Sequence, residues 1–373
     1  MKILELTNYS SGICGVWQRV KQESLELSKK GHDVRVFSSN KVKSSEEIAP
    51  SHEKIEKIEI TRFPAKKIGG ESFLNWSFKK EAIIFKPDII IAHSYRHPHT
   101  TKAIGIAKKI NAKVFLVTHA PFGRKETRSF LSNQITYIYD KVVGPFILKK
   151  FNKVITITKW ENKYLKNLGV RDEHISYIPN GIPEEFFNIP KEKEENKILF
   201  LGRVSPIKNL EVLIESMSKI KDKKIKLEIV GPAESEYLLK LKKQVKDSDL
   251  EKRIIFSKGI YDLNKKIEKI DASNIFVLPS KSEGMPQGLI EAMARERVVI
   301  ASNNEAAREL IKDKKNGFLF KIGDSEELSK SIDLILGKTN SKEIAEIRKL
   351  SKKSVEAFNW NNIIKKIEKT ISM

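Results

Sequence analysis

Two glutamates, Glu283 and Glu291, stand eight residues apart around a Gly-Met-Pro turn in the segment SEGMPQGLIEAMA, residues 282–294. An apolar run of strand length, NIFVLPS, precedes this segment, and residues rich in Ala, Leu and Met follow the turn. The pattern predicts a passage from strand to helix with one carboxylate on each side of the bend. Parallel sheets bind ligands at such turns, and a carboxylate accepts hydrogen bonds from sugar hydroxyls. The helix dipole favours glutamate near a helix start, which accounts for either residue alone but not for both together with the turn.

Two cations stand at the end of another predicted strand. Arg203 and Lys208 follow the apolar run ILFLG and precede the helical pattern NLEVLIES. The carboxyl end of a strand and the amino end of a helix form an anion site, where two cations can neutralise a diphosphate leaving group without a metal ion. The amides around residues 284–288, with Pro286 suited to the first helical position, are expected to point at the same space. For the two cations alone, solvated side chains in a loop are an equally good interpretation.

The first half of the chain shows one series of alternating strand and helix patterns. The strand KILELT, a glycine-containing loop and the helix VWQRVKQESLELSKK, which Gly31 ends, come first. DVRVFSS is the next strand, and further strands are predicted at residues 88–93, 113–118 and 153–158. This alternation predicts an α/β fold with a parallel, doubly wound sheet.

The series restarts after the charged passage KEKEEN, which we interpret as a linker. A second sheet is predicted from the runs ILFLGR, KLEIVG, RIIFSKG, NIFVLPS and RVVIAS, with a helix near residues 209–220. The length of 373 residues also exceeds one ordinary core. We therefore expect two Rossmann-like domains, residues 1–180 and 181–355, and a C-terminal helix, residues 356–373, that joins the first domain.

Composition narrows the class of protein. A hydrophobic content of 40% and a charged content of 32% fit a soluble globular protein, and no apolar run reaches the ~20 residues of a membrane span. The start MKILELTN has a strand pattern rather than that of a signal peptide, and the single cysteine, Cys14, excludes an internal disulfide. We expect a cytoplasmic protein that contacts the membrane surface at most peripherally.

The net charge of +22 is unevenly distributed. Residues 1–180 contain 32 Lys and Arg against 17 Asp and Glu, and residues 96–166 contain 15 basic residues against three acidic ones. Such a field attracts nucleic acid, anionic lipid and phosphorylated substrates alike. The stretch FGRKETRSFLSNQITYIYDKVVGPFILKKF mixes basic and aromatic residues as interfacial surfaces do. A solvated basic face fits it equally well.

A dinucleotide site is disfavoured. The first loop lacks the Gly-x-Gly-x-x-Gly pattern, since it contains only Gly12 and Gly15. The second strand ends in Phe-Ser-Ser-Asn, without an acidic residue for an adenosine ribose.

Two patterns that suggest metal binding are also set aside. Asp247 and Asp249 have the Asp-x-Asp spacing of a metal site, but they precede a strand and so belong to the opposite edge of the sheet. His93, His97 and His99 cluster after a strand, but no carboxylate or cysteine near them in the sequence completes a ligand set. Acceptor contact and a plain loop are the remaining interpretations of the histidines.

The stretches ILFLGRVSPIKNLEVLIES, VLPSKSEGMPQGLIEAMA and YIPNGIPEEFF together resemble the retaining nucleotide-sugar glycosyltransferases of family four, the glycosyl transferases group 1. The resemblance covers nearly the whole chain and is most specific at the two glutamates separated by seven residues. It implies a GT-B fold, in which two Rossmann-like domains face each other across a cleft. It also implies that Glu283 faces the donor sugar, that Glu291 binds the nucleotide ribose, and that Gly284, Met285 and Pro286 lie at the donor between them.

The resemblance assigns further residues. It implies that Arg203 and Lys208 bind the donor diphosphate and act with Glu283 in catalysis. GICGVWQRV resembles the family's glycine loop, which maps to Gly15, although Cys14 interrupts the usual glycine pair. VTHAPFG resembles the active-site histidine segment and so marks His119 as catalytic. Taken without the resemblance, that residue would be interpreted as a structural loop histidine.

The implied reaction moves a hexose from a UDP-, GDP- or ADP-linked sugar to an acceptor hydroxyl, with retention, in the synthesis of glycolipid, glycan or cell-surface polysaccharide. We expect no metal ion or other cofactor, an acceptor that can be lipid-linked, and no nucleic-acid partner. No carboxylate is securely placed for double displacement, and the resemblance implies front-face attack. Two alternatives stay open: a GT-B-type sugar-nucleotide epimerase, and a non-enzymatic nucleic-acid-binding protein, for which the chain has charge but no reading motif.

Overall fold

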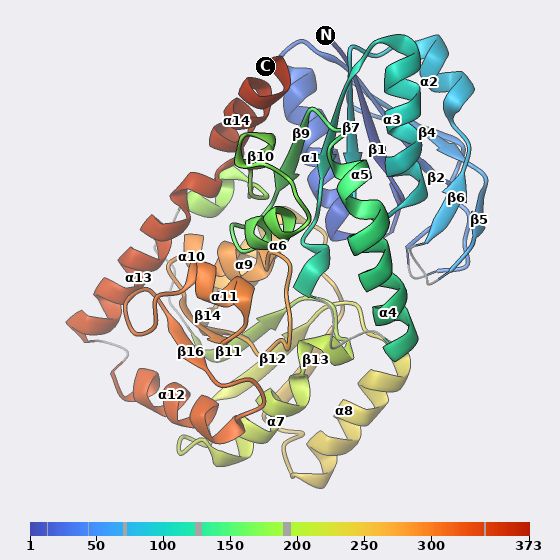
Figure 1. The fold of residues 1–373 in the computed structure, drawn as a ribbon. Coiled ribbons are helices and arrows are strands. Elements are labelled where there is room, and N and C mark those ends of the chain that lie inside the picture. Colours follow the sequence, from blue (N-terminus) through green and yellow to red (C-terminus); the bar gives the residue numbers. More distant parts are fainter. Residues whose placement is uncertain (13, 44, 70–72, 124–128, 189–194, 339–340) are drawn as a thin grey trace. The chain divides into compact units, whose positions relative to one another are not determined.

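The computed structural model describes residues 1–12, 14–43, 45–69, 73–123, 129–188, 195–338 and 341–373. The chain forms two compact units. Unit 1 contains Met1–Gly181 together with Trp360–Met373, and unit 2 contains Ile182–Asn359. The last helix therefore packs with the unit formed by the first half of the chain (Figure 1).

Unit 1 is built on an eight-stranded sheet with the order β10-β9-β8-β7-β1-β2-β4-β3. All neighbouring strands are parallel except β3 and β4, and a separate hairpin pairs β5 with β6. The predicted strands of the first half are confirmed. The strands are β1 (Lys2–Thr7), β2 (Asp33–Ser39), β3 (His52–Ile55), β4 (Ile58–Phe63), β5 (Ala65–Lys67), β6 (Leu74–Trp76), β7 (Ile89–His93), β8 (Lys113–Val117), β9 (Lys153–Thr156) and β10 (Ile175–Tyr177).

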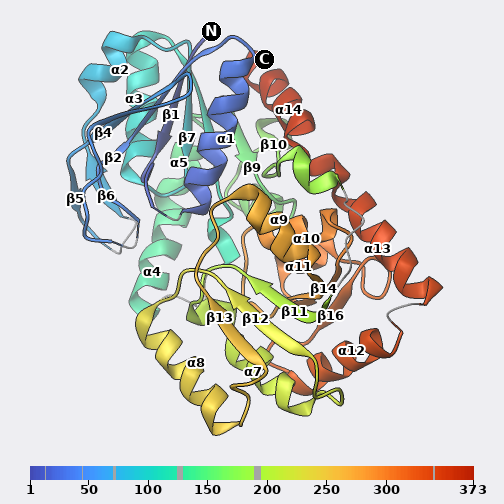
Figure 2. The same ribbon diagram turned by 180° about the vertical axis from the view of Figure 1, so that it is seen from behind.

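Helices cover both faces of this sheet, as Figure 2 shows from behind. One face packs against α1, which in turn contacts α14, and the other packs against α2 and α3. Helix α1 ends just before Gly31, whose φ of +87° is the left-handed conformation that glycine adopts readily. The helical elements are α1 (Gly15–Lys29), α2 (Lys79–Phe85), α3 (Pro98–Ile110), α4 (Phe130–Ile138), a π-helical segment (Tyr139–Val143), α5 (Gly144–Leu148), α6 (Glu161–Asn167) and α14 (Trp360–Ser372), with 3-10 turns at Pro121–Gly123 and Asp172–His174.

Unit 2 is built on a fully parallel six-stranded sheet with the order β13-β12-β11-β14-β15-β16. The strands predicted for the second series are confirmed, and their buried residues form one continuous apolar core. The strands are β11 (Glu195–Leu201), β12 (Lys226–Val230), β13 (Ile254–Ser257), β14 (Ser273–Leu278), β15 (Val298–Ser302) and β16 (Phe318–Phe320).

The helices of unit 2 also lie on both faces of the sheet: α7, α8 and α12 on one face, and α9, α10 and α13 on the other (Figure 1). Asp247 ends α8 and Asp249 precedes β13, so this pair lies at the amino edge of the sheet, as predicted. The helical elements are α7 (Leu210–Lys219), α8 (Ser235–Asp247), α9 (Leu263–Asp271), α10 (Gln287–Ala294), α11 (Glu305–Leu310), α12 (Ser325–Gly337) and α13 (Lys342–Val355), with 3-10 turns at Glu184–Phe187, Pro206–Lys208 and Glu356–Phe358.

None of the helices in the described ranges combines the length and the apolarity that a membrane span requires.

Candidate functional site

The strand order of unit 2 places a topological switch point between β11 and β14. From β11 the chain proceeds outward to β12 and β13, and it then returns to β14 on the other side of β11. The connections after these two strands therefore leave the sheet in opposite directions and open a crevice at its carboxyl edge, which is where doubly wound sheets bind ligands. Arg203 follows β11, and Glu283 follows β14.

The loop after β11 is held against the neighbouring loop after β12. The amide of Gly202 donates to the carbonyl of Val230 over 3.0 Å, and the amide of Val204 donates to the carbonyl of Pro232 over 2.8 Å. Gly231 makes this approach possible, because a Cβ atom added there would lie 1.8 Å from the carbonyl oxygen of Gly202. We did not single out this glycine from the sequence. Its position directly after the run KLEIV, at the carboxyl end of a strand, was the available signal.

A backbone hydrogen bond joins the two loops at the switch point. The amide of Lys281 donates to the carbonyl of Ile207 over 2.9 Å. The same arrangement brings together two of the predicted site residues, since Nζ of Lys208 lies 2.5 Å from Oε1 of Glu283. Both side chains are largely shielded from solvent, with exposed fractions of 18% and 11%. Arg203 is more open to solvent, and its Nη1 lies 3.8 Å from Oε1 of Glu234.

Helix α10 begins one residue later than the sequence suggests. Pro286 has a φ of −79° and a ψ of 92° and is the N-cap, so the first helical residue is Gln287 rather than the proline. The fixed φ of proline is compatible with both the N-cap and the first helical position. The extended ψ of Pro286 shows that it is the N-cap. Gly288 lets the first turn approach β11, since a Cβ atom there would lie 2.9 Å from the carbonyl oxygen of Leu201. Met285 packs partly against the apolar core.

Glu291 has a different partner from Glu283. It lies in α10 and is buried, and its Oε1 is 2.5 Å from Nζ of Lys266 in α9. The same ammonium group lies 5.7 Å from the centre of the Phe186 ring. Lys266 is a second residue that sequence reasoning missed, because nothing in its own segment distinguishes it from the other lysines of α9.

Buried polar atoms without hydrogen-bond partners gather around this switch point. Among the described residues, they include Oγ of Ser205, Nδ2 of Asn209, Oγ of Ser280, Nε2 of Gln287 and Oε2 of Glu291. These atoms belong to the loop after β11, the loop after β14 and helix α10. Proteins rarely leave such groups unsatisfied without a reason. The cluster is therefore able to hydrogen-bond a polar ligand that carries both donors and acceptors.

Unit 1 has its own switch point, between β1 and β7. His119 lies close to it, just after β8, and its Nε2 is 2.9 Å from Nδ1 of His93, the last residue of β7. The other ring nitrogen of His93 lies 2.7 Å from Oε2 of Glu5 in β1. A chain of hydrogen bonds thus leads from a buried carboxyl group to His119. Burial lowers the pKa of His93 well below its ordinary value and raises the pKa of Glu5.

The backbone that carries His119 is strained. His119 and Ala120 have φ angles of +59° and +49°, which non-glycine residues seldom adopt. Glu161 in α6 holds this turn: its Oε1 accepts hydrogen bonds from Oγ1 of Thr118 over 2.5 Å and from the amide of Ala120 over 2.9 Å. Burial raises the pKa of Glu161 to about 7, although hydrogen bonds from Thr118 and Thr158 act in the opposite direction.

The fold brings two carboxylates from distant parts of the sequence to one of these histidines. Oxygen atoms of Glu5 and Glu23 and a nitrogen of His93 lie within 4.8 Å of one another. These carboxylates come from residues 88 and 70 positions earlier in the chain, so local sequence spacing could not reveal them. A guanidinium already supplies the positive charge, because Nε of Arg19 lies 2.6 Å from Oε2 of Glu23 with both side chains buried. We therefore assign no metal to this cluster.

The other two histidines of this group are separated. His97 is the N-cap of α3, and its Nδ1 lies 3.0 Å from Nδ2 of Asn8, in the loop after β1. His99 is fully buried, and its Nε2 is 2.8 Å from the carbonyl oxygen of His93. Burial lowers the pKa of His99 to about 3. These residues therefore shape the edge of the sheet rather than forming a plain loop.

The glycines of the first loop differ in their surroundings. Gly12 has a φ of +77°, and a Cβ atom there would lie 3.0 Å from the backbone of Lys43, so protein contacts alone explain it. Gly15 begins α1, and a Cβ atom there would meet no atom within 4 Å. Among the described residues, no contact requires glycine at position 15, which leaves room for a ligand to approach.

Comparison with known proteins places the chain among glycosyltransferases. Residues 13–186 match the family model described as Glycosyltransferase Family 4, and residues 181–353 match that described as Glycosyl transferases group 1. An uncharacterized glycosyltransferase of Methanocaldococcus jannaschii is 29% identical over 97% of this chain and 95% of its own. The UDP-Gal:alpha-D-GlcNAc-diphosphoundecaprenol alpha-1,3-galactosyltransferase of Escherichia coli is 29% identical over 73% of each chain.

The fold agrees with these matches. The structure of HepE from Anabaena in complex with UDP is similar with a TM-score of 0.79 and 17% identity, over the full length of both chains. The expected GT-B architecture of two Rossmann-like domains is thereby confirmed.

Proposed function

Since the chain belongs to the group 1 glycosyltransferases, we propose that it transfers a hexose from a nucleoside-diphosphate sugar to an acceptor hydroxyl, with retention of the anomeric configuration. In this proposal unit 2 binds the donor and unit 1 binds the acceptor. The nucleotide is UDP, GDP or ADP, and the product is a glycolipid, a glycan or a cell-surface polysaccharide.

The cluster of unsatisfied polar atoms in unit 2 carries this proposal. Five buried side-chain atoms from the two loops and from α10 offer both donors and acceptors at the switch point. Oxygen Oε2 of Glu291 is one of them, while Oε1 of the same residue is held by Lys266. A ribose hydroxyl that donates to Oε2 would give this oxygen the hydrogen-bond partner that it lacks. We therefore assign the ribose of the donor to Glu291.

The diphosphate is assigned to the two cations. Arg203, at the carboxyl end of β11, is open to solvent, and Lys208 follows it in the same loop. Without donor, the ammonium group of Lys208 is paired with Glu283. An arriving diphosphate would compete for this ammonium group and leave Glu283 to accept hydrogen bonds from the donor sugar. In this proposal the two cations stabilise the leaving diphosphate, so the reaction needs no metal ion.

The transfer step is proposed to occur on one face of the sugar. The acceptor oxygen forms a bond to the anomeric carbon while the bond between that carbon and the phosphate oxygen breaks. The departing phosphate oxygen takes the proton of the acceptor hydroxyl. His119, held on its strained turn by Glu161, is assigned to contact the reacting sugar.

We further propose that the protein is cytoplasmic and binds peripherally to anionic membranes. An apolar stripe runs along α4, the π-helical segment and α5, and it consists of Leu131, Ile135, Ile138, Val142 and Phe146. The spacing of three and four residues places these side chains on one face of the helix, and each is between 59% and 71% exposed. Lys141, Lys149 and Lys150 near the stripe are exposed as well. Apolar side chains beside lysines suit an anionic lipid surface.

Vesicle flotation tests the membrane proposal. The wild type should float with vesicles that contain anionic lipid more than with neutral vesicles, and Ile135→Ser should float less. Ile84→Ser is the matched control, because Ile84 in α2 is 72% exposed but lies outside the stripe. Equal flotation of wild type and Ile135→Ser would refute this use of the stripe.

Thermal unfolding with saturating UDP, GDP or ADP tests the donor site. A nucleotide at a hundredfold excess over its Kd should stabilise the protein by about 2.7 kcal/mol. We expect one nucleotide to stabilise the wild type and the control Glu251→Gln, whose side chain is exposed, but not Glu291→Gln. If no nucleotide shifts the transition and short duplex DNA does, the chain is a nucleic-acid-binding protein and the proposal fails. Donor turnover that changes the sugar itself, without transfer, would indicate an epimerase.

A further inference from the structure

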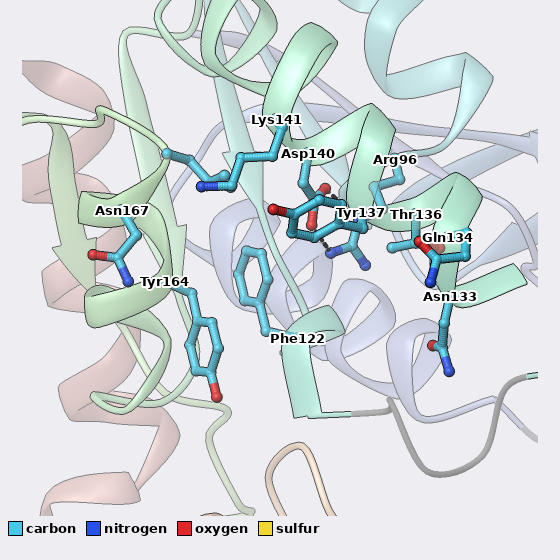
Figure 3. A pocket seen from close by; sticks show the side chains of 11 residues that line it. Arg96, Phe122, Asn133, Gln134, Thr136, Tyr137, Asp140, Lys141, Tyr164 and Asn167 are labelled. Carbon is cyan, nitrogen blue, oxygen red and sulfur yellow. Dashed lines mark hydrogen bonds and ion pairs between the residues drawn. The ribbon is translucent and has the colours of Figure 1, made fainter. Parts of the chain in front are cut away.

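Unit 1 contains a cavity of about 630 Å³ that the reaction scheme above does not use. Its lining includes Arg96, Phe122, Asn133, Tyr137, Asp140 and Tyr164, whose side chains are shown in Figure 3. The volume falls in the range of ~300–1,000 Å³ that is usual for small-molecule sites. Its lining residues come from the segments after β7 and β8, from α4 with the π-helical segment, and from α6.

Two aromatic rings form one wall of this cavity. The rings of Phe122 and Tyr164 are parallel, with an interplanar angle of 1° and centroids 5.3 Å apart, and Figure 3 shows them side by side. Flat aromatic faces beside a few polar groups are typical of ligand pockets. A pyranose ring, whose faces carry C–H groups and whose rim carries hydroxyls, matches a wall of this kind.

Polar groups lie beside these rings. The guanidinium of Arg96 binds both carboxylate oxygens of Asp140, over 2.8 and 2.5 Å, and lies 5.2 Å from the centre of the Phe122 ring. This pair neutralises its own charge, and Lys141 adds one cation to the lining, so the pocket offers hydrogen bonds to hydroxyl groups with a positive charge beside them. The amides of Asn133 and Gln134 add donors and acceptors from α4.

Helix α4 exposes its apolar face to solvent, unlike an ordinary surface helix. None of its residues is buried, and Asn133, Gln134 and Thr136 line the cavity while the apolar stripe is exposed to solvent. Surface helices usually turn their apolar face to the core. The reversal places an apolar surface and a polar pocket on two faces of the same helix.

We propose that this cavity binds the saccharide of a lipid-anchored acceptor, while the acceptor's alkyl chain lies along the apolar stripe. The inference rests on the proposed transferase activity and adds the class of acceptor and the residues that recognise it. The location supports it: Phe122 is three residues from His119, and Tyr164 is three residues from Glu161, which holds the His119 turn. The cavity is therefore built on the same carboxyl edge of the sheet as the histidine assigned to the reaction.

The test is isothermal titration of the full chain with octyl glycosides of glucose, galactose, mannose and N-acetylglucosamine below their critical micelle concentrations. The control amphiphile is octyl tetraethylene glycol, which has the same alkyl chain without a sugar. We expect at least one glycoside to bind tenfold more tightly than the control amphiphile. The double variant Asn133→Ala, Gln134→Ala should lose most of this tenfold preference, whereas Ser132→Ala, a neighbour in α4 outside the lining, should keep it.

Two further measurements keep the result unambiguous. The variant Ile135→Ser should weaken the binding of the glycoside and of the control amphiphile alike, because it changes only the stripe. Stabilisation by nucleotide should be the same in all these variants, so a failure of the donor site would be seen separately. The proposal is overturned if no glycoside binds better than the control amphiphile, or if the double variant binds the preferred glycoside with wild-type affinity.

Discussion

The contact between Gly231 and Gly202 should control the position of Arg203. In Gly231→Ala, the new Cβ atom would lie 1.8 Å from the carbonyl oxygen of Gly202 and 2.7 Å from its carbonyl carbon. Ordinary contacts of this kind begin at 3.4 Å, so the loop has to move by about 1.6 Å unless the sheet distorts. Backbone atoms are involved on both sides, and no side-chain rotation can relieve the overlap.

This displacement should lower both the rate of transfer and the stability of the protein. A misplacement of about 1 Å can cost on the order of 100-fold in rate, which corresponds to about 2.7 kcal/mol of transition-state stabilisation. Overpacking at one site typically costs about 1–3 kcal/mol of unfolding free energy. We therefore expect a folded variant with a roughly 100-fold lower kcat/KM.

The donor in the assay is the sugar derivative of whichever nucleotide stabilises the wild type. The assay measures the initial rate at which the nucleotide is released from this donor. Gly337→Ala is the matched control, because a Cβ atom at this residue of α12 would meet no atom within 4 Å. Its rate should equal that of the wild type. A cooperatively folded Gly231→Ala protein with wild-type kcat/KM would refute the view that this contact positions the diphosphate site.

Three further predictions concern single charged or titratable groups. Lys208→Met should raise the Kd for the nucleotide at least tenfold, measured by titration calorimetry, because it removes a diphosphate contact and the partner of Glu283; an unchanged Kd would contradict the assignment. His119→Ala should lower kcat about 100-fold. It should not change the stabilisation by nucleotide, because His119 lies in unit 1 and the nucleotide is assigned to unit 2. An unchanged kcat would remove His119 from the catalytic residues. Burial raises the pKa of Glu161 to about 7 from 4.5, so its contribution to stability is complete below pH 4.5 and is lost, by about 3 kcal/mol, as the pH rises through 7. Urea unfolding at pH 5 and pH 8 should show this loss as a difference between the wild type and Glu161→Gln, in which all other groups titrate alike.

Local patterns in the sequence predicted the central strands of both sheets, but not β3 to β6, β10 or β16. Short apolar runs that end in glycine or in charged residues predict buried parallel strands, and this pattern located the ends of β14 within two residues and those of β11 within three. The glutamates, the glycine and the proline of residues 283–291 lie in one such connection, so their proximity follows from chain geometry alone. The start of α10 at Gln287 instead of Pro286 shows the usual limit of that reasoning.

Side-chain pairings between distant segments were decided only by the tertiary structure. Lys208 and Glu283 are 75 residues apart, and they meet because β11 and β14 are neighbours in the sheet. Glu5 and His93 are 88 residues apart and meet because β1 pairs with β7. Strand order depends on how whole helices and strands pack, and local periodicity does not encode it. The sequence likewise shows the apolar and basic residues around α4. Only the packing of the helix shows that its polar face lines a cavity and that its apolar face is exposed to solvent.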